Sequence, residues 1–387
     1  MTDEEIVLAA GKLQRYIESE DYSGYDPYDA LKSPLFKLPG FSNNKYFRFA
    51  AQQVVKRSPV NLRPLLHVPK GKNPVTLGLC IQAYAGMMKR SEDRRALEEK
   101  CDILIHELEG MIPGGFHGAC WGYDFDWEAR HAKIPAFQPT VVATGIITNG
   151  LFSLYRQTGN PKALDLCRSA CQFVLQDLLR TVDADGDFCF SYSPFDRQQV
   201  FNASMKGARL LAQVFHVDKE EKMRTAAAKA VQFVIKHQQD SGAWNYSLAA
   251  SGAWVDNYHT GYVLDCLDEY MQCTGDYRYK KNLETGMSYY RRHFFEDEGI
   301  PKFYDNRTFP VDCTAAAQSL LTLCRFQEVI LAKKVAGWMI KHMQDEKGYF
   351  YFRLYKNHTV KTSFMRWSNA WMFAGLSELI SNNTDLK

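Results

Sequence analysis

Gly-Asp-Phe at 186–188, Gly-Ala-Trp at 242–244 and Gly-Tyr-Phe at 348–350 each follow a segment with helical periodicity and precede a new one. Gly-Gly-Phe at 114–116 and Gly-Ile-Pro-Lys-Phe at 299–303 stand in the same position. These glycines lie roughly 50–70 residues apart, which is longer than the common short helical repeats but suits two helices and a long loop. The sequence therefore predicts a repeated array of helical hairpins.

Two kinds of helix alternate along the chain. One kind carries Lys, Arg and Glu on one face, as outer helices do, and is expected at about 3–18, 91–108, 161–179, 218–238, 276–294 and 327–343. The other kind is small and apolar nearly all round, as buried helices are, and is expected at about 74–90, 138–157, 199–215, 257–273, 311–325 and 366–381. Six inner and six outer helices in alternation predict an all-α fold, an (α/α)6 toroid.

No low-complexity tract or Pro/Ser linker divides the chain, so we assign residues 1–387 to a single domain. A helix near 44–57 is left over from the alternation, and we interpret residues 20–73 as an N-terminal segment lying across one end of the toroid. The loops that enter the inner helices are long and hold most of the Trp, Tyr, Asp and Gly. We expect the binding site at the end that carries these loops, because loops on a rigid scaffold carry function.

Composition excludes several classes of protein. The 47 basic and 44 acidic residues give a net charge of only +3, which argues against nucleic acid as a partner. No apolar run is long enough to span a membrane, and Met1–Ala10 lacks the pattern of a signal peptide. The ten cysteines form no CxxC pair and fall in apolar helical stretches, as in proteins of a reducing compartment, so we expect a cytoplasmic protein. The histidine spacings and glycine motifs predict neither a metal nor a nucleotide cofactor, and they leave the oligomeric state open.

The loop at 113–140 is the densest in aromatic and acidic residues. Aromatic faces beside carboxylates suit a sugar, whose C–H face packs on a ring while its hydroxyls bind acids. The candidate substrate-binding residues of this loop are His117, Trp121, Tyr123, Asp124, Asp126 and Trp127. Alternatively, the tryptophans fix the loop to the barrel and the aspartates cap turns.

Asp256, Tyr258 and His259 stand where a long loop enters an inner helix, and backbone N–H groups at such a helix start favour anions. Tyr258 and His259 offer a proton donor and a proton acceptor near neutral pH. Asp312 holds the corresponding position in the next hairpin, after Tyr304, and two carboxylates facing one cavity can perform sugar chemistry. Asp256 is equally consistent with a simple helix N-cap.

Further candidates lie at both ends of the chain. Tyr25, Asp26 and Arg63 precede the first inner helix, and Arg366 and Trp367 begin the last one. Arg63 and Arg366 are suited to clamp a carboxylate or a phosphate, which predicts an anionic ligand. Each arginine alone is equally consistent with pairing to a local aspartate.

Four motifs carry a resemblance to a known family: Asp-Pro-Tyr-Asp at 26–29, Asn-Leu-Arg-Pro at 61–64, Asp-Asn-Tyr-His-Thr-Gly at 256–261 and Arg-Trp-Ser-Asn-Ala-Trp at 366–371. They resemble a poorly characterised group of bacterial and archaeal proteins encoded with polysaccharide-biosynthesis genes, within the six-hairpin glycosidase-like superfamily of α/α toroids. That superfamily includes N-acylglucosamine 2-epimerases, unsaturated glucuronyl hydrolases, uronate lyases and glucuronyl C5-epimerases. Tyr258-His259-Thr260 is similar to a Tyr-His-Thr stretch of the last of these, although the chain lacks their additional β-domain.

We therefore expect an enzyme that acts on an anionic saccharide by proton-transfer chemistry, as an epimerase or a lyase. Tyr258 and His259 are the candidate acid and base, and Arg63 or Arg366 is the candidate clamp for the developing enolate. Glycoside hydrolysis by a carboxylate pair, Asp256 with Asp312 or Asp124, is an alternative. A non-catalytic saccharide-binding or assembly factor is another.

Overall fold

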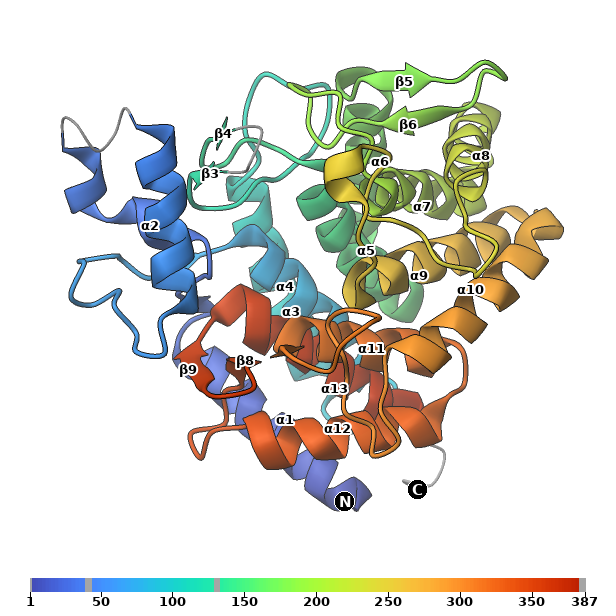
Figure 1. Cartoon of the computed structure of the whole chain (residues 1–387). Helices are drawn as coiled ribbons and strands as arrows, with labels where there is room; N and C mark the ends of the chain where they lie inside the picture. Colours follow the sequence, from blue (N-terminus) through green and yellow to red (C-terminus); the bar gives the residue numbers. More distant parts are fainter. Residues whose placement is uncertain (1, 39–43, 129–132, 383–387) are drawn as a thin grey trace.

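The computed structural model describes residues 2–38, 44–128 and 133–382. Within these ranges six apolar helices form an inner ring, in which each helix packs against the next and the last packs against the first (Figure 1). They are α3 (Pro74–Met87), α5 (Val141–Thr158), α7 (Phe201–Asp218), α9 (Asn257–Thr274), α11 (Cys313–Arg325) and α13 (Trp371–Asn382). Nearly all of their side chains are buried.

An outer layer surrounds this ring, and each outer helix packs against an inner one. Its members are α4 (Arg94–Gly110), α6 (Pro161–Gln172), α8 (Glu221–Ile235), α10 (Lys280–His293), α12 (Val329–Met343) and α1 (Asp3–Ser19). The N-terminal α1 packs against the C-terminal α13, so the two ends of the chain complete the sixth hairpin. The predicted (α/α)6 toroid is confirmed.

The repeated glycines all occupy one kind of turn. Gly115, Gly186, Gly242, Gly299 and Gly348 have φ between 81° and 100°, the left-handed region that favours glycine. In the last four, the glycine N–H donates to the carbonyl three residues earlier, at 2.8–3.2 Å. The chain then turns back, since the first residue of each turn donates to the carbonyl four residues later, at 2.8–3.1 Å. This shared turn redirects the chain from each outer helix into its long loop.

Short irregular elements occupy the loops. The strands pair antiparallel as β1 (Ser23–Gly24) with β2 (Gly71–Lys72), β3 (Trp127–Glu128) with β4 (Lys133–Ile134), β5 (Arg180–Val182) with β6 (Phe188–Phe190), and β7 (Val311–Asp312), β8 (Tyr351–Leu354) and β9 (Thr359–Ser363) in one sheet. Single turns lie at η1 (Asp29–Lys32), η2 (Pro34–Lys37), η3 (Phe173–Asp177), η4 (Ala250–Gly252), η5 (Tyr277–Tyr279) and η6 (Met365–Ala370). The extra helix α2 (Lys45–Arg57) packs beside η1 and β3, away from the ring (Figure 1).

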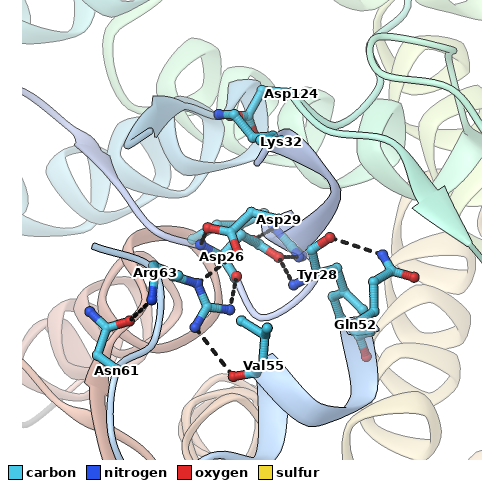
Figure 2. Close-up of polar contacts among 10 residues, drawn as sticks. Asp26, Tyr28, Asp29, Lys32, Gln52, Val55, Asn61, Arg63 and Asp124 are labelled. Atoms are coloured by element: carbon cyan, nitrogen blue, oxygen red, sulfur yellow. Dashed lines mark hydrogen bonds and ion pairs between the residues drawn. The ribbon is translucent and has the colours of Figure 1, made fainter. Parts of the chain in front are cut away.

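A buried arginine holds the N-terminal segment together. The guanidinium of Arg63 donates to the Asp29 carboxylate at 2.7 Å, to the Asp26 carbonyl at 2.7 Å and to the Val55 carbonyl at 3.5 Å (Figure 2). Arg63 is fully buried, so these bonds satisfy a charge that has no access to water. It therefore fixes the loop before α2, the end of α2 and the loop after it as one unit.

The helix α8 begins at Glu221 without a side-chain cap, and Asp218, the last residue of α7, accepts from Arg168. The cysteines are all ten buried and unpaired, as expected of small apolar residues. None of the described helices is both long and apolar enough to cross a membrane.

The closest approach of two inner helices gives a first prediction. A Cβ at Gly150 of α5 would lie 2.1 Å from the backbone oxygen of Gly78 in α3. We expect Gly150→Ala to force these helices apart and to lower the free energy of unfolding by about 1–3 kcal/mol or more. The measurement is the urea midpoint, with Gly110→Ala as the matched control.

At Gly110, in the last turn of α4, an added Cβ meets nothing within 4 Å. Because alanine is the better helix former, we expect this control to keep the midpoint or raise the free energy of unfolding by up to about 1 kcal/mol. Equal midpoints for the two variants would show that the packing of α3 on α5 tolerates a methyl group, against the prediction.

Candidate active site

The candidate catalytic residues gather where α9 begins. Asp256 is the N-cap of α9, with its Oδ1 accepting from the backbone N–H of His259 at 3.0 Å. Its Oδ2 accepts from Trp254 Nε1 at 3.0 Å and lies 2.6 Å from His259 Nδ1. In the neutral imidazole this contact places the proton on Nδ1 and leaves Nε2 as the acceptor. The His259 side chain keeps 19% exposure, so a buried carboxylate positions an imidazole that solvent can reach.

Tyr258 lies beside this base. Its ring centroid is 4.2 Å from that of His259, and the residue is half-buried. Burial raises the pKa of Tyr258 well above its usual value, and the Asp256 carboxylate adds to the effect. The phenol therefore stays protonated at neutral pH, which suits a proton donor rather than a base.

Aromatic rings surround the pair. Tyr258 lies 5.9 Å from Trp367, Trp367 lies 5.6 Å from Tyr28, and Tyr28 lies 5.8 Å from Trp127, centroid to centroid. We call these four residues, together with Tyr192, Tyr246, Trp254 and Tyr262, the aromatic group. The loops before α3, α5, α7 and α9, the first turns of α9, and η6 just before α13 contribute to it, at the end of the toroid that carries the long loops. Such rings suit the C–H faces of a sugar.

Trp254 is the most accessible member of this group. Its side chain is 38% exposed and stacks on Tyr246 with a centroid distance of 4.7 Å and an interplanar angle of 11°. Tyr246 in turn lies 4.6 Å from the ring of His259. An indole held by Asp256 and directed to solvent is therefore placed to meet a ligand that approaches His259.

Asp312 does not offer a free carboxylate. It is fully buried, caps α11 by accepting from Ala315 N at 3.1 Å, and forms an ion pair with Arg353. Trp367 Nε1 donates to the same oxygen as Arg353, at 3.5 Å. Both of its oxygens are therefore engaged away from solvent, which argues against a catalytic Asp312, and that role stays a prediction. Asp256 likewise acts through His259 rather than as a free acid.

The two candidate arginines are also engaged. Arg366 forms a bidentate pair with Asp26, at 2.7 and 2.9 Å, and both residues are buried. Arg63 pairs with Asp29 in the N-terminal segment. Neither is free to clamp a substrate anion, so the predicted ligand-binding role of Arg63, Arg366 and Asp26 is corrected to a structural one. Pairing with an aspartate was the alternative for each arginine.

Two aromatic candidates of the 113–140 loop are structural as well. Trp121 is fully buried and donates from Nε1 to the Leu108 carbonyl at 2.9 Å, so it fixes the loop to α4 and cannot reach a ligand. Tyr123 stacks on Phe125 at 5.6 Å and lies under the guanidinium of Arg366 at 4.7 Å. Tyr123 therefore has a structural role, through its packing on Phe125 and Arg366.

The two aspartates of this loop bind within the protein. Asp124 pairs with Lys32 at 2.8 Å and accepts from Asn73 Nδ2 at 2.7 Å, which ties the loop to the N-terminal segment (Figure 2 shows the Lys32 contact). Asp126 pairs with Lys133 at 3.2 Å across the β3–β4 hairpin. Both carboxylates stabilise the loop; Asp124 keeps 9% and Asp126 39% of its side chain exposed, and their contact with a substrate stays a prediction.

The remaining candidates divide between the site and the surface. His117 is exposed and its Nδ1 lies 2.7 Å from Asp177; within the described part of the chain no ring contact joins it to the aromatic group, and its role in substrate binding stays a prediction. Trp127 does join the aromatic group, packing on Tyr28 and on Tyr192 at 6.3 Å. The structure thus brings together Asp256, Tyr258, His259, Trp127 and Trp367.

Tyr304 and Tyr25 lie at the edges of the site. Tyr304 pairs through its backbone with Asp256, and its ring packs under the guanidinium of Arg307 at 4.3 Å. Tyr25 pairs through its backbone with Phe364 and lines a separate outer groove of about 390 Å³. Tyr304 therefore remains beside the catalytic pair, and Tyr25 faces away towards the groove.

Sequence reasoning missed a buried lysine. Lys56 Nζ of α2 donates to the hydroxyl of Tyr28 at 2.6 Å. Burial lowers the pKa of Lys56 well below its usual range, and the charge of Arg353 lowers it further. Tyr28 stood in the Asp-Pro-Tyr-Asp motif, but Lys56 gave no signal, because lysine is common in a polar helix. Tyr262 could have been found from the sequence, because it follows Tyr258 by one helical turn on the same face of α9.

One acidic cluster could hold a cation. Asp183, Asp185 and Asp187 bring carboxylate oxygens within 4.8 Å of one another in the β5–β6 turn. The ammonium of Lys236 contacts all three, at 2.9, 2.7 and 2.5 Å. A positive charge of the chain itself therefore occupies the centre of this cluster.

Comparisons with known proteins agree with this architecture. The chain superposes on a cellobiose 2-epimerase from Bacillus thermoamylovorans with TM-score 0.62 and 12% identity, covering 80% of this chain and 87% of that one. It matches a possible member of the GH105 family from Salmonella enterica with TM-score 0.62 and 11% identity, over 99% and 95% of the two chains. A heparin-specific unsaturated glucuronyl hydrolase gives TM-score 0.60 and 12% identity over 97% and 96%.

No protein-family model matches the sequence, and no curated protein matches it either. The structural likenesses therefore establish the fold, an (α/α)6 toroid, and nothing finer. At 11–12% identity they carry no residue-by-residue assignment.

The burial of Asp312 yields a second prediction. Asp312→Asn leaves the guanidinium of Arg353 buried without a countercharge, and breaking such a pair costs about 3–5 kcal/mol. We expect a clear drop in the thermal midpoint. Asp165→Asn is the control, because its pair with Arg168 lies at the surface and contributes at most about 1 kcal/mol. A variant of wild-type stability that had lost all turnover would instead make Asp312 catalytic.

Proposed function

We propose that the chain is a single-domain enzyme that moves a proton at a ring carbon of a saccharide, as an epimerase or a lyase. The contact between Asp256 and His259 Nδ1 carries the proposal, because in the neutral imidazole it holds the proton on Nδ1 and leaves Nε2 as the acceptor. The toroid fold that the chain shares with sugar epimerases and glucuronyl hydrolases supports a saccharide as the substrate. The buried, unpaired cysteines support a reducing compartment, and we propose the cytoplasm.

The chemistry follows from the positions of the two side chains. His259 Nε2 accepts the proton of a carbon next to a carbonyl or carboxyl group, and the electron pair moves to that oxygen. The resulting imidazolium is stabilised by Asp256, which holds the ring in place throughout. Tyr258, kept protonated by burial, donates to an oxygen on the same side of the sugar.

A second proton-carrying pair lies across Trp367 from Tyr258. Tyr28 and Lys56 share a hydrogen bond of 2.6 Å, and the Tyr28 ring is 5.6 Å from Trp367. Return of a proton from this side gives the epimer, whereas loss of the oxygen substituent one carbon further on gives an unsaturated sugar. Epimerisation is the first choice because it uses both pairs.

The charge of the substrate is a separate point. With Arg63 and Arg366 paired to aspartates, the anionic saccharide expected from the sequence has no arginine clamp, and Lys56 could serve as its countercharge only if the bound anion raises the pKa that burial lowers. We propose a saccharide as the substrate class and, more specifically, an anionic saccharide. A uronic acid and its neutral analogue, compared at equal concentration, decide it through the ratio of their kcat/KM values.

Glycoside hydrolysis is the second candidate. The toroid fold shared with GH76 glycoside hydrolases favours it. The sealed positions of Asp256 and Asp312 count against it, since a hydrolase needs one carboxyl group at the scissile bond as acid and another as base or nucleophile. Binding without turnover is the remaining alternative.

Solvent deuterium separates these reactions. We expect the enzyme, incubated with uronic-acid and neutral oligosaccharides in deuterium oxide, to place deuterium on a ring carbon without chain cleavage. His259→Ala removes the base and should lower that rate by about 10²–10⁴-fold. The control is His106→Ala, whose side chain is 88% exposed on α4.

New reducing ends would indicate hydrolysis, and an unsaturated product a lyase. Retention of the full rate in His259→Ala would refute the assignment of the base. Binding across the panel with none of these products would establish the non-catalytic alternative.

Trp254 gives a prediction about binding. Removal of its exposed indole by Trp254→Ala takes away one stacking surface, which is worth about 0.5–1.5 kcal/mol beyond buried area. We expect KM to rise roughly 2–10-fold with a smaller change in kcat. Tyr277→Ala, an exposed aromatic residue of the outer layer, is the control and should change neither constant. An unchanged KM for Trp254→Ala would remove this residue from the site.

A further inference from the structure

A second cavity opens at the other end of the toroid, where the inner helices finish. It has a volume of about 240 Å³ and is lined mainly by polar residues. Every inner helix contributes, through Gln82 of α3, Asn149 of α5, Gln213 of α7, Glu269 of α9, Gln318 of α11 and Glu378 of α13. Tyr262 also lines it, and its other neighbours are Tyr258 and His259, so this ring separates the cavity from the candidate active site.

A lysine without an ion-pair partner lines this cavity. Lys206 is only 1% exposed, its ammonium forms no ion pair or hydrogen bond within the described part of the chain, and Asp265 acts on it only as a more distant charge. Its sole close partner is the face of Tyr262, 3.4 Å from Nζ to the centroid. Burial, together with the charge of Arg209, lowers the pKa of Lys206 to about 7. A buried donor is thus left available to a ligand.

Two buried acceptors face the same space. Asp265 accepts from Gln318 through Oδ2 at 2.7 Å, but its Oδ1 has no partner. Gln213 donates from Nε2 to Glu269 at 2.9 Å, but its Oε1 has no partner. Buried polar atoms are normally hydrogen-bonded, so a lone donor and two lone acceptors around one cavity indicate a missing occupant.

The remaining charges of the cavity are only partly balanced by carboxylates. Arg156 and Arg325 both pair with Glu269, at 2.7 and 3.0 Å, whereas Arg209 donates to the Gly145 carbonyl at 2.6 Å. The C-terminal ends of the inner helices also lie here, and their dipoles offset positive charge and disfavour an anion. The free groups, one donor and two acceptors, suit a neutral molecule that both donates and accepts.

We propose that this cavity binds a neutral sugar of monosaccharide size. Its hydroxyls donate to Asp265 Oδ1 and Gln213 Oε1 and accept from Lys206 Nζ, while its C–H face packs on the ring of Tyr262. The volume lies just below the range of about 300–1,000 Å³ found for drug-sized ligands, which matches a single sugar ring. The proposal holds whichever reaction the other end of the toroid performs.

The test is calorimetric titration of the full chain with glucose, galactose, mannose and N-acetylglucosamine, and separately with inorganic phosphate. We expect at least one sugar to bind and phosphate not to bind. Lys206→Met keeps the buried stem but removes the donor, and should weaken that sugar at least tenfold. Asp265→Asn, which replaces the free acceptor by an amide, should weaken it similarly. Thermal midpoints check that both variants fold.

Lys56→Met is the matched control, because Lys56 is also a buried lysine but lies at the end with the long loops. It should leave sugar binding at this cavity unchanged. If Lys56→Met abolishes binding while Lys206→Met does not, the sugar occupies the candidate active site, and this inference fails while the proposed function stands. Absence of binding for all four sugars, or binding of phosphate in their place, overturns the inference directly.

Discussion

Hydrogen bonds at the starts of the inner helices are the interaction on which the rest of the structure depends. Asn73, Thr140, Asp256 and Asp312 each stand just before an inner helix and accept from a backbone N–H of its first turn. These caps fix where each helix begins, and closure of the ring brings all of these starts to one end. At α9 the cap also binds His259, three residues on, so the helix start and the proposed base share one carboxylate.

The architecture could be predicted from the sequence because its signals are local. A glycine with positive φ, a proline at the first turn of α6 and an apolar run without charges each report on a few neighbouring residues. The same locality identified Asp256, Tyr258 and His259, since a cap and the residues of the first turn are consecutive in the chain. Tyr262 belonged to this class and follows from helical spacing alone.

The roles of the charged residues could not be predicted, because their partners are distant in sequence. Arg366 pairs with Asp26, 340 residues away. Arg353 forms its ion pair with Asp312 because the two residues stand opposite each other in the β7–β8 pairing. A sequence shows that an arginine is present near a site but not whether a carboxylate already neutralises it. For this reason the two arginines expected to clamp an anion are found in buried ion pairs, and the contact of Lys56 with Tyr28 was not predicted.

A ring of six helices encloses an axis that side chains must fill, and the two ends of this axis are filled differently. Where the helices begin, aromatic side chains meet around His259. Where they end, amides and paired charges surround an open volume with unsatisfied atoms. Tyr262 is shared, with Tyr258 on one side and the ammonium of Lys206 on the other. An occupant that displaces this ring from either side therefore changes the surface that the opposite end presents.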